Sequence, residues 1–345
     1  MVRVLTIGTG TRDIFLKSGL FKVLRDPKHL ERIGFPTGEA QCFAMGGKVE
    51  IDDLVATVGG DAANAAVTFA RQGFKTETLM KIGGDQNGRD VYSHLLVEKI
   101  KPIFRPSNGL KNDVSVILLS RSGERTVLVF RAISKTWDKK DVPLDKLNQQ
   151  VVYVAPGRIP FSVLEMTLVK LKKNGAFIAM NPSKHYLDFG AEKLKNVFKY
   201  LDLIIANREE GSYLTGAKYE DETEIFKKFD DLFGGLVIMT DGPKGVLVSN
   251  GEKIYRAGIF KEKKIVDRTG AGDAFGSGFV AGLHHVSKSI REFTDADIMR
   301  AIRLGSANAT SVVEAVGAQP GILTRRQFEN ESRWKNLSMT VKRIK

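Results

Sequence analysis

Apolar residues along the chain fall into two kinds of segment, short continuous runs and longer stretches with helical spacing. The short runs are typical of buried strands, and they lie at Val2–Ile7, Glu77–Ile82, Val151–Ala155, Ala176–Met180, Leu203–Ala206 and Leu236–Thr240. The stretches between them predict helices over Ala62–Arg71, Gly88–Lys99, Phe161–Lys173, Ala191–Tyr200, Glu209–Leu214, Thr223–Leu232, Ala271–His285 and Asp295–Val316. Strands separated by helices of this length predict an α/β fold with a mostly parallel central sheet covered on both faces.

Two β-rich segments interrupt this alternation. Val114–Leu119 and Thr126–Phe130 flank the polar turn Ser120–Arg125, which predicts a hairpin instead of a strand–helix–strand unit. We expect this hairpin to form a small β lid beside the main sheet. A second hairpin is predicted over 244–256, with its turn at Asn250–Gly251.

The segment Ile14–Ala56 has no clean periodicity, although it contains four phenylalanines. It is too long for a plain loop, so it either extends the lid or walls a substrate site. We therefore expect one domain over 1–330, with lid elements at about 14–56 and 110–135, followed by a basic C-terminal tail at 331–345.

Composition narrows the class of protein. The chain has 345 residues, of which 42% are hydrophobic, enough for a large core. Its net charge of +13 comes from basic residues spread along the chain, which favours a general surface bias over a nucleic-acid site. The single Cys42 excludes an intramolecular disulfide and a multi-cysteine metal site. With no apolar run of the ~20 residues that cross a bilayer and no signal-peptide pattern, we expect a cytoplasmic enzyme without membrane contacts.

The stretch Asp267–Phe275, DRTGAGDAF, carries the chemistry. Its two glycines let the backbone approach a ligand closely, and a helix then begins at about Gly272. The free N–H groups and the positive dipole end of that helix form an anion hole suited to phosphate. Asp273 would repel a phosphate bound there, which favours a role in accepting a proton from an attacking alcohol.

The alternative for Asp273 is ordinary helix capping, in which a first-turn carboxylate stabilises the dipole by ~0.3–1 kcal/mol. The glycines and threonine before it, and the helix of small residues after it, favour the phosphate site. The sequence has no GxxxxGK[ST] pattern, which excludes a Walker-type nucleotide site.

DRTGAGDAF resembles the C-terminal signature of the PfkB (ribokinase-like) carbohydrate and nucleoside kinases. Further matches follow in family order over nearly the whole chain: GTGTRD at Gly8–Asp13, GGDAAN at Gly59–Asn64, NREE at Asn207–Glu210, TDG at Thr240–Gly242 and the pair Gly317–Ala318. The resemblance implies a ribokinase-like three-layer sandwich, with ATP as phosphoryl donor and Mg²⁺ as cofactor.

The resemblance also implies a role for each matching residue. Asp273 would be the catalytic base, and the backbone of Gly270, Ala271 and Gly272 would hold the developing phosphate charge. The expected acceptor-binding residues are Asp13, Gly59, Gly60, Asn64 and Asp85. The expected nucleotide-binding residues are Asn207, Thr240, Gly242, Asn308, Gly317 and Ala318. Glu210 and Asn207 would organise Mg²⁺ through water.

Three features of the chain bear on how far the family pattern extends. The resemblance implies a monovalent cation (K⁺) site at Asp267 and Thr269, although Arg268 replaces a small residue of the family pattern. The spacer between Asp13 and Gly59 is about twenty residues longer than in the shorter ribokinases, which leaves the acceptor open. Alternating apolar residues in the lid hairpin predict a homodimer through the lid.

Three functions fit the sequence. The first is an ATP-dependent kinase of a small sugar, of the ribokinase, fructokinase or keto-deoxy-gluconate kinase type. The second is a nucleoside kinase of the same fold, whose base would occupy an apolar slot in the insertion at 14–56. The third is a non-catalytic kinase-like binding protein, which the intact Asp273, Gly270 and Gly272 disfavour.

Overall fold

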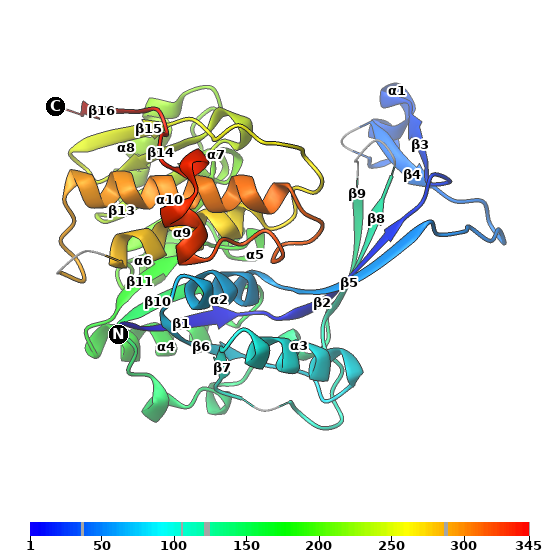
Figure 1. Ribbon diagram of the computed structural model, residues 1–345, viewed down its shortest axis with the longest axis horizontal. Helices are drawn as coiled ribbons and strands as arrows, with labels where there is room; N and C mark the ends of the chain where they lie inside the picture. Colours follow the sequence, from blue (N-terminus) through cyan, green and yellow to red (C-terminus); the bar gives the residue numbers. More distant parts are fainter. Residues whose placement is uncertain (36–37, 105, 121–124, 286–288, 345) are drawn as a thin grey trace.

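The main sheet runs through the body of the computed structural model, which describes residues 1–35, 38–104, 106–120, 125–285 and 289–344 (Figure 1). Its strand order is β16-β15-β14-β13-β12-β11-β10-β1-β6-β7. The strands are β1 (Arg3–Gly8), β6 (Lys75–Met80), β7 (Lys101–Pro102), β10 (Val151–Ala155), β11 (Phe177–Met180), β12 (Leu203–Asn207), β13 (Leu236–Thr240), β14 (Val246–Ser249), β15 (Lys253–Ala257) and β16 (Met339–Arg343). Neighbours from β7 to β13 are parallel, and β13 to β16 are antiparallel. The predicted mostly parallel sheet is confirmed.

Helices cover both faces of this sheet. One face carries α2 (Asp61–Arg71), α9 (Ala271–His284) and α10 (Asp295–Val313), and the other carries α4 (Phe161–Lys173), α6 (Ala191–Phe198) and α8 (Glu222–Leu232). The remaining helices are α1 (Pro27–Leu30), α3 (Gln86–Val97), α5 (Lys184–Leu187), α7 (Arg208–Thr215) and α11 (Arg325–Asn330). Short 3₁₀ turns are η1 (Glu31–Ile33), η2 (Ile133–Lys135), η3 (Lys139–Asp141), η4 (Leu144–Lys146), η5 (Gly242–Lys244) and η6 (Ser332–Trp334).

The two apolar layers of the core follow from strand alternation. Ile205 on β12 belongs to the same core cluster as Phe279 of α9, whereas its neighbour Ile204 belongs to the cluster that contains Leu168 of α4 and Phe226 of α8. Successive side chains of a strand point to opposite faces, so a strand covered on both sides is apolar throughout. The result is the predicted three-layer sandwich. Within the described chain, none of the helices combines the length and the apolar character needed to span a bilayer.

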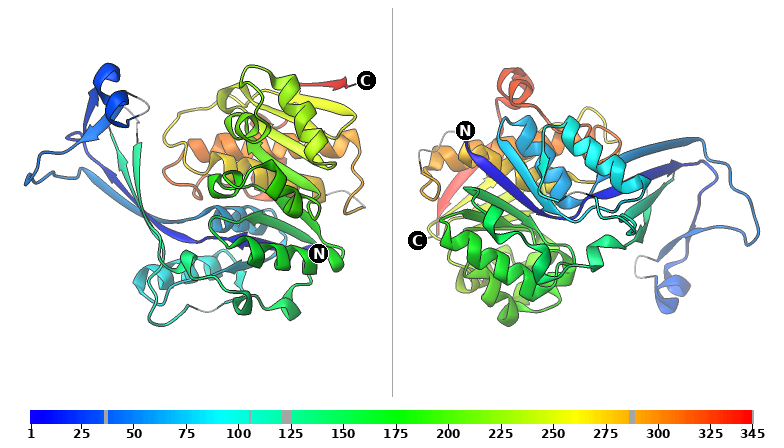
Figure 2. Two further views of the ribbon diagram at one scale, coloured as in Figure 1. Left: turned by 180° about the vertical axis from the view of Figure 1, so that it is seen from behind. Right: turned by 90° about the horizontal axis from the view of Figure 1, so that it is seen from below.

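A second sheet projects from the body and forms the lid (Figures 1 and 2). Its order is β5-β2-β8-β9, with strands β2 (Thr11–Lys17), β5 (Asp53–Gly59), β8 (Val114–Leu119) and β9 (Arg125–Phe130). The segment 14–56 therefore extends the lid, since its ends lie in β2 and β5 and its middle carries the hairpin β3 (Lys22–Arg25) and β4 (Glu39–Cys42). Residues 121–124 of the predicted turn lie outside the described residues.

The segment expected as a basic tail, 331–345, is instead part of the folded body over its described residues 331–344. Trp334 is buried and its ring contacts Phe260 edge-on. Beyond it, β16 pairs antiparallel with β15 over Lys253–Ala257 and adds a strand to the sheet edge. The basic residues of this segment had suggested a solvated tail, but Lys342 and Arg343 lie exposed on this edge strand and Arg333 pairs with Glu314.

Candidate active site

Two cavities lie on either side of the first turn of α9. The larger, about 490 Å³, lies under the lid, and Gly270 and Asp273 are among its lining residues. The smaller, about 240 Å³, is lined in part by Ala271 and Gly272. The first N–H groups of a helix have no partner within the helix and carry its positive dipole end. An anion is therefore favoured at the boundary between the two cavities.

Gly270 makes this turn possible. It has φ of 76°, in the left-handed region, and a Cβ there would overlap the side chain of Ala318. Glycine adopts this conformation without steric cost. A Cβ on Gly272, in contrast, would meet no atom within 4 Å, which leaves the helix end accessible from the smaller cavity.

Asp273 occupies the first turn of α9 on the side of the larger cavity. Burial raises the pKa of its carboxyl well above the ordinary value, and the nearby charges of Asp61 and, more weakly, Asp13 raise that pKa further. A hydrogen bond of 2.9 Å from Nδ2 of Asn64 to Oδ2 of Asp273 acts in the opposite direction. A carboxylate with a raised pKa is a stronger base, which suits proton abstraction from an alcohol.

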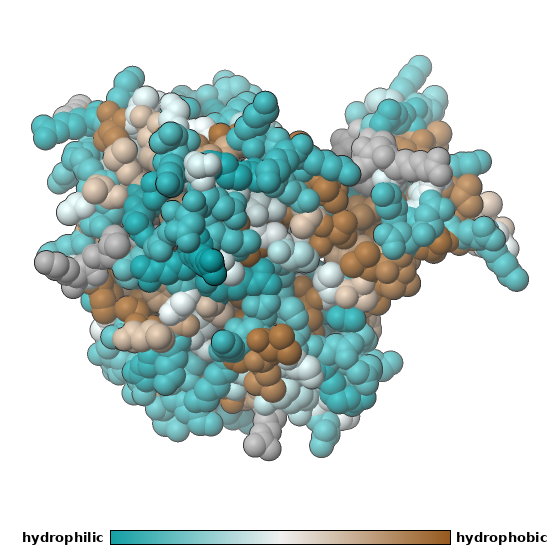
Figure 3. Space-filling view, in the orientation of Figure 1, coloured by the Kyte–Doolittle hydropathy of each residue, from teal (hydrophilic) through white to brown (hydrophobic). Residues whose placement is uncertain are grey.

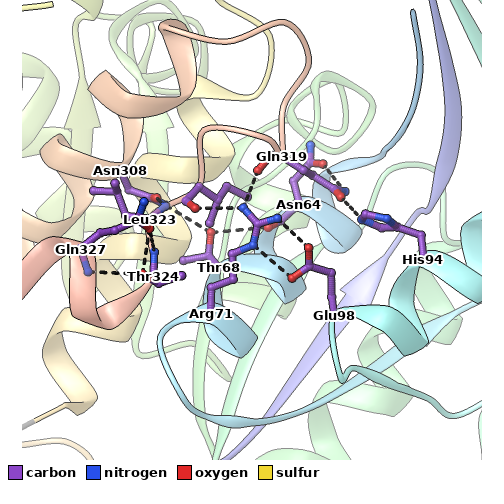
Figure 4. Close-up of polar contacts among 11 residues, drawn as sticks. Asn64, Thr68, Arg71, His94, Glu98, Asn308, Gln319, Leu323, Thr324 and Gln327 are labelled. Atoms are coloured by element: carbon purple, nitrogen blue, oxygen red, sulfur yellow. Dashed lines mark hydrogen bonds and ion pairs between the residues drawn. The ribbon is translucent and has the colours of Figure 1, made fainter.

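A buried polar network holds Asn64 in place (Figure 4). Gln319 donates from Nε2 to Oδ1 of Asn64 at 2.9 Å, and Nε2 of His94 lies 2.7 Å from Oε1 of Gln319. Arg71 pairs with Glu98 and also donates to the backbone carbonyl of Gln319. This network turns the amide nitrogen of Asn64 toward Asp273. Sequence reasoning missed Gln319, although it directly follows the Gly317–Ala318 pair.

The expected acceptor residues Asp13, Gly60 and Asn64 line the larger cavity together with Asp273. Oγ1 of Thr11 donates to Oδ1 of Asp13 at 2.7 Å, and burial raises the pKa of the Asp13 carboxyl. Gly59 lies behind Asp13, because a Cβ on Gly59 would overlap the Asp13 carboxylate. These positions bring a carboxylate and an amide to the same cavity as the expected base.

Asp85 does not line this cavity, contrary to expectation. It is the N-cap of α3 and accepts hydrogen bonds from the backbone N–H groups of Gly88 and Asn112, both at 3.1 Å. A short carboxylate before a helix favours this capping arrangement. Asp85 therefore has a structural role here: it caps α3 and holds the backbone at Asn112.

The expected nucleotide residues Thr240 and Gly242 line the smaller cavity, and Asn207 pairs in register with Thr240 at the carboxyl ends of β12 and β13. Asn207, Gly317 and Ala318 are not among its lining residues, contrary to expectation, and neither is Asn308. The Asn308 side chain is fully buried and bonds Oγ1 of Thr68, the carbonyl of Ala274 and N–H of Leu323. The α10 residues lining the cavity are Ser306, Ala309, Thr310 and Val313.

Asn207 and Glu210 form a reciprocal N-cap of α7. Oδ1 of Asn207 accepts from N–H of Glu210, and Oε2 of Glu210 accepts from N–H of Asn207, both at 2.8 Å. Burial raises the pKa of the Glu210 carboxyl, and Asp61 and Glu209 add to this despite the hydrogen bond from Asn207. A bound Mg²⁺ would offset this negative charge, so the residues fit a cation held partly through water.

Asp267 and Thr269 fit a monovalent cation less well. Asp267 Oδ1 accepts from N–H and Oγ1 of Thr269 at 3.0 and 2.7 Å, and its Oδ2 accepts from N–H of Gly317 at 3.1 Å. Arg125 of the lid strand β9 places NH1 3.2 Å from Asp267 Oδ1 and 2.8 Å from Oγ1 of Thr269. The carboxylate therefore already has a cationic partner, which sequence reasoning could not pair with it across 142 positions.

Comparisons with known proteins bear on the family and the fold. The pfkB family carbohydrate kinase profile matches residues 37–325. An ATP-dependent 6-phosphofructokinase of Thermoanaerobacterium thermosaccharolyticum is 27% identical over 79% of this chain and 84% of its own length. A ribokinase of Haemophilus influenzae is 29% identical over 78% of this chain and 85% of its own. The solved ribokinase of Arabidopsis thaliana, complexed with ribose and ATP, shares the fold at a TM-score of 0.74 and 19% identity, covering 97% of this chain and 100% of that one.

Proposed function

Because the chain belongs to the pfkB family of carbohydrate kinases, phosphotransferases that act on a hydroxyl group, we propose that it phosphorylates the hydroxymethyl group of a small sugar, with ATP as donor. One observation carries the proposal. The first turn of α9 separates the two cavities, with Asp273 facing the larger one and Ala271–Gly272 the smaller. An acceptor in the larger cavity and a triphosphate in the smaller would meet at the helix N-terminus.

In this reaction Asp273 takes the proton of the acceptor hydroxyl while the oxygen forms a bond to the γ-phosphorus. The bond from that phosphorus to the β-γ bridging oxygen breaks, and ADP leaves with the electron pair. The N–H groups at Gly270, Ala271 and Gly272 stabilise the charge that develops on the transferred group. Asn64 orients the Asp273 carboxylate through their 2.9 Å hydrogen bond.

Mg²⁺ is part of this proposal, with Asn207 and Glu210 as the residues that would hold it. When bound with a nucleotide, this ion neutralises phosphate charge. Among the described residues, no group of three or more His, Cys, Asp or Glu side chains is placed to hold a metal. Coordination would therefore rely on water and the phosphates, which is usual for Mg²⁺.

We place the enzyme in the cytoplasm as part of the same proposal.

A nucleoside kinase is the second candidate. The insertion at 14–56 belongs to the lid, although none of its described residues lines the acceptor cavity. ATP consumption measured with sugars, sugar acids, sugar phosphates and nucleosides tests both candidates. A sugar as preferred acceptor is the expected result. A nucleoside that exceeds every sugar would replace the first candidate by the second, and ATP binding without transfer to any acceptor would support a binding protein instead.

We further propose that Arg125 takes the place of a monovalent cation at Asp267. The wild-type enzyme should then show equal activity in K⁺, Na⁺ and tetramethylammonium salts at matched ionic strength. Arg125→Ala should lower activity, because it leaves the buried Asp267 without its cationic partner. K⁺ should restore part of that loss. Strong activation of the wild-type enzyme by K⁺ alone would contradict the substitution of Arg125 for the ion.

A homodimer through the lid is also expected. Register places Leu128 and Phe130 of β9 on the same outer face as Val116 of β8 and Ile14 of β2, while the alternate residues face the cavity. Leu128 and Phe130 are 54% and 51% exposed, and apolar surface is visible where the lid joins the body (Figure 3). A second copy would bury this face.

Light scattering at micromolar protein concentration measures the oligomeric state and tests this prediction. The wild-type protein should be a dimer, and Leu128→Glu should be a monomer, because a carboxylate would be buried in the interface. Leu96→Glu, at a 51% exposed position on α3, serves as the control and should leave the dimer intact. A monomeric wild-type protein would rule out the lid interface.

A further inference from the structure

The acceptor cavity is lined by both carboxylates and cationic side chains. Three of its carboxylates, those of Asp13, Asp61 and Asp273, come from β2 and from the first turns of α2 and α9. The basic side chains come from other elements. Arg158 and His185 follow β10 and β11, which are adjacent parallel strands, and Arg131 follows the lid strand β9. A ligand that fills the cavity therefore meets both kinds of charge.

Two of the cations in this cavity are already paired. Arg125 binds Asp267 as described above, and Nζ of Lys184 lies 3.0 Å from Oδ1 of Asp188. Arg131 and Arg158 differ from them. Within the described part of the chain, neither guanidinium group makes a hydrogen bond or a close ion pair. Arg131 attracts the Asp61 carboxylate only at longer range.

The loop that carries Arg158 is fixed to the neighbouring loop. Oγ of Ser183 donates to the backbone carbonyl of Gly157 at 2.6 Å, which ties the carboxyl end of β10 to that of β11. An unpaired surface arginine is ordinarily just solvated. Here two of them, from the body and from the lid, line one cavity, and guanidinium groups bind phosphate and carboxylate through paired N–H groups.

Resting on the proposed function, we propose that the acceptor is a sugar bearing an anionic group, a phosphate or a carboxylate, which Arg131 and Arg158 bind. The carboxylates of Asp13, Asp61 and Asp273 repel such a group, so it lies away from the base. The sugar hydroxyls then face Asp13 and Asn64, and the reacting hydroxyl lies at Asp273. Binding of the anionic group at Arg131 and Arg158 and of the hydroxyls at Asp13 and Asn64 thereby fixes which end of the sugar is phosphorylated.

The test compares kcat and KM of the full-length enzyme for three groups of acceptors. Neutral acceptors are ribose, fructose, adenosine and cytidine, the carboxylate arm is 2-keto-3-deoxygluconate, and the phosphate arm is fructose 6-phosphate and ribose 1-phosphate. The best acceptor should be anionic. Arg158→Gln and Arg131→Gln should each raise its KM about 10- to 100-fold, the scale of one hydrogen bond to a charged group. The KM for ATP should stay unchanged.

The control is Arg326→Gln, the same substitution at an exposed position on α11 outside both cavities. It should leave every constant as in the wild type. A neutral sugar or nucleoside as best acceptor, with KM insensitive to Arg158→Gln, overturns the anionic acceptor but leaves the kinase proposal standing.

Calorimetry with the same anionic sugars separates the remaining outcomes. Binding that weakens in Arg158→Gln, without phosphoryl transfer in the wild type, supports the anionic ligand and overturns the kinase proposal. If no anionic sugar of the panel binds or reacts, the anionic acceptor is overturned. Where an anionic sugar does bind or react, the two arms of the panel decide between phosphate and carboxylate as the charged group.

Discussion

Asp273→Asn should lower kcat by at least ~10²-fold, the usual scale for loss of a general base. The amide keeps the shape of the side chain but cannot take the proton of the acceptor hydroxyl. The affinity for ATP should change little, because the smaller cavity is lined by Ala271 and Gly272 and not by Asp273. Steady-state rates with the best acceptor, together with ATP binding by calorimetry, provide the measurement.

Asp145→Asn, at an exposed position in η4, is the matched control and should retain full activity. Near-normal turnover in Asp273→Asn would show that another group takes the proton. The amide variant also affects the hydrogen bond from Asn64, so circular dichroism and thermal unfolding should confirm that both variants are folded.

The raised pKa of Asp273 gives the same assignment a pH signature. Since a base acts only when deprotonated, kcat should be full above this raised pKa and fall as the pH drops through it. Asp61→Asn removes a like charge that raises the pKa, so the acidic limb should move to lower pH. A limb that stays in place would show that Asp61 does not act on the base.

The periodicity of the sequence predicted the main sheet because its strands are buried on both faces. Runs such as Val151–Ala155 are apolar without a break, and only a strand covered by two helix layers has that pattern. The form of the segment 14–56, which extends the lid, could not be predicted, because its strands are not buried on both faces. In Thr11–Lys17, apolar and polar residues occur on both faces, because one face lines a polar cavity and the other is partly exposed.

The residues of the α9 turn were found because their chemistry is local in the sequence. Asn308 was misplaced since a helix of small residues fits either a pocket wall or close helix packing. In the structure, Gly278 on α9 lies close to Gly305 on α10, so the small residues there allow the two helices to pack closely. The pair of Arg125 and Asp267 and the contact of Gln319 with Asn64 join residues far apart in the chain, so only the fold reveals them.

Asp13→Ala should lose most of kcat/KM for the true acceptor. Asp13 is buried at the start of the lid sheet, where its carboxylate accepts from Thr11 and lines the cavity beside Asn64. A carboxylate in this position can accept hydrogen bonds from two sugar hydroxyls. Without it, those hydroxyls are left unpaired in a closed site, at a cost of about 1–3 kcal/mol for each buried group.

The expected loss in kcat/KM is thus on the order of 10- to 100-fold for one or two unpaired hydroxyls. Asp53→Ala removes an exposed carboxylate from the neighbouring lid strand β5 and should leave kcat/KM unchanged. The effect should also depend on the acceptor, because an analogue that lacks the contacted hydroxyl loses nothing further when Asp13 is removed. This coupling is measured as in a double-mutant cycle. We compare kcat/KM of the wild type and of Asp13→Ala for ribose and its deoxy analogues, or for the best acceptor and its deoxy analogues. If Asp13→Ala is silent with every acceptor, the sugar hydroxyls bind elsewhere in the cavity and the assignment of Asp13 as a hydroxyl-binding residue is wrong.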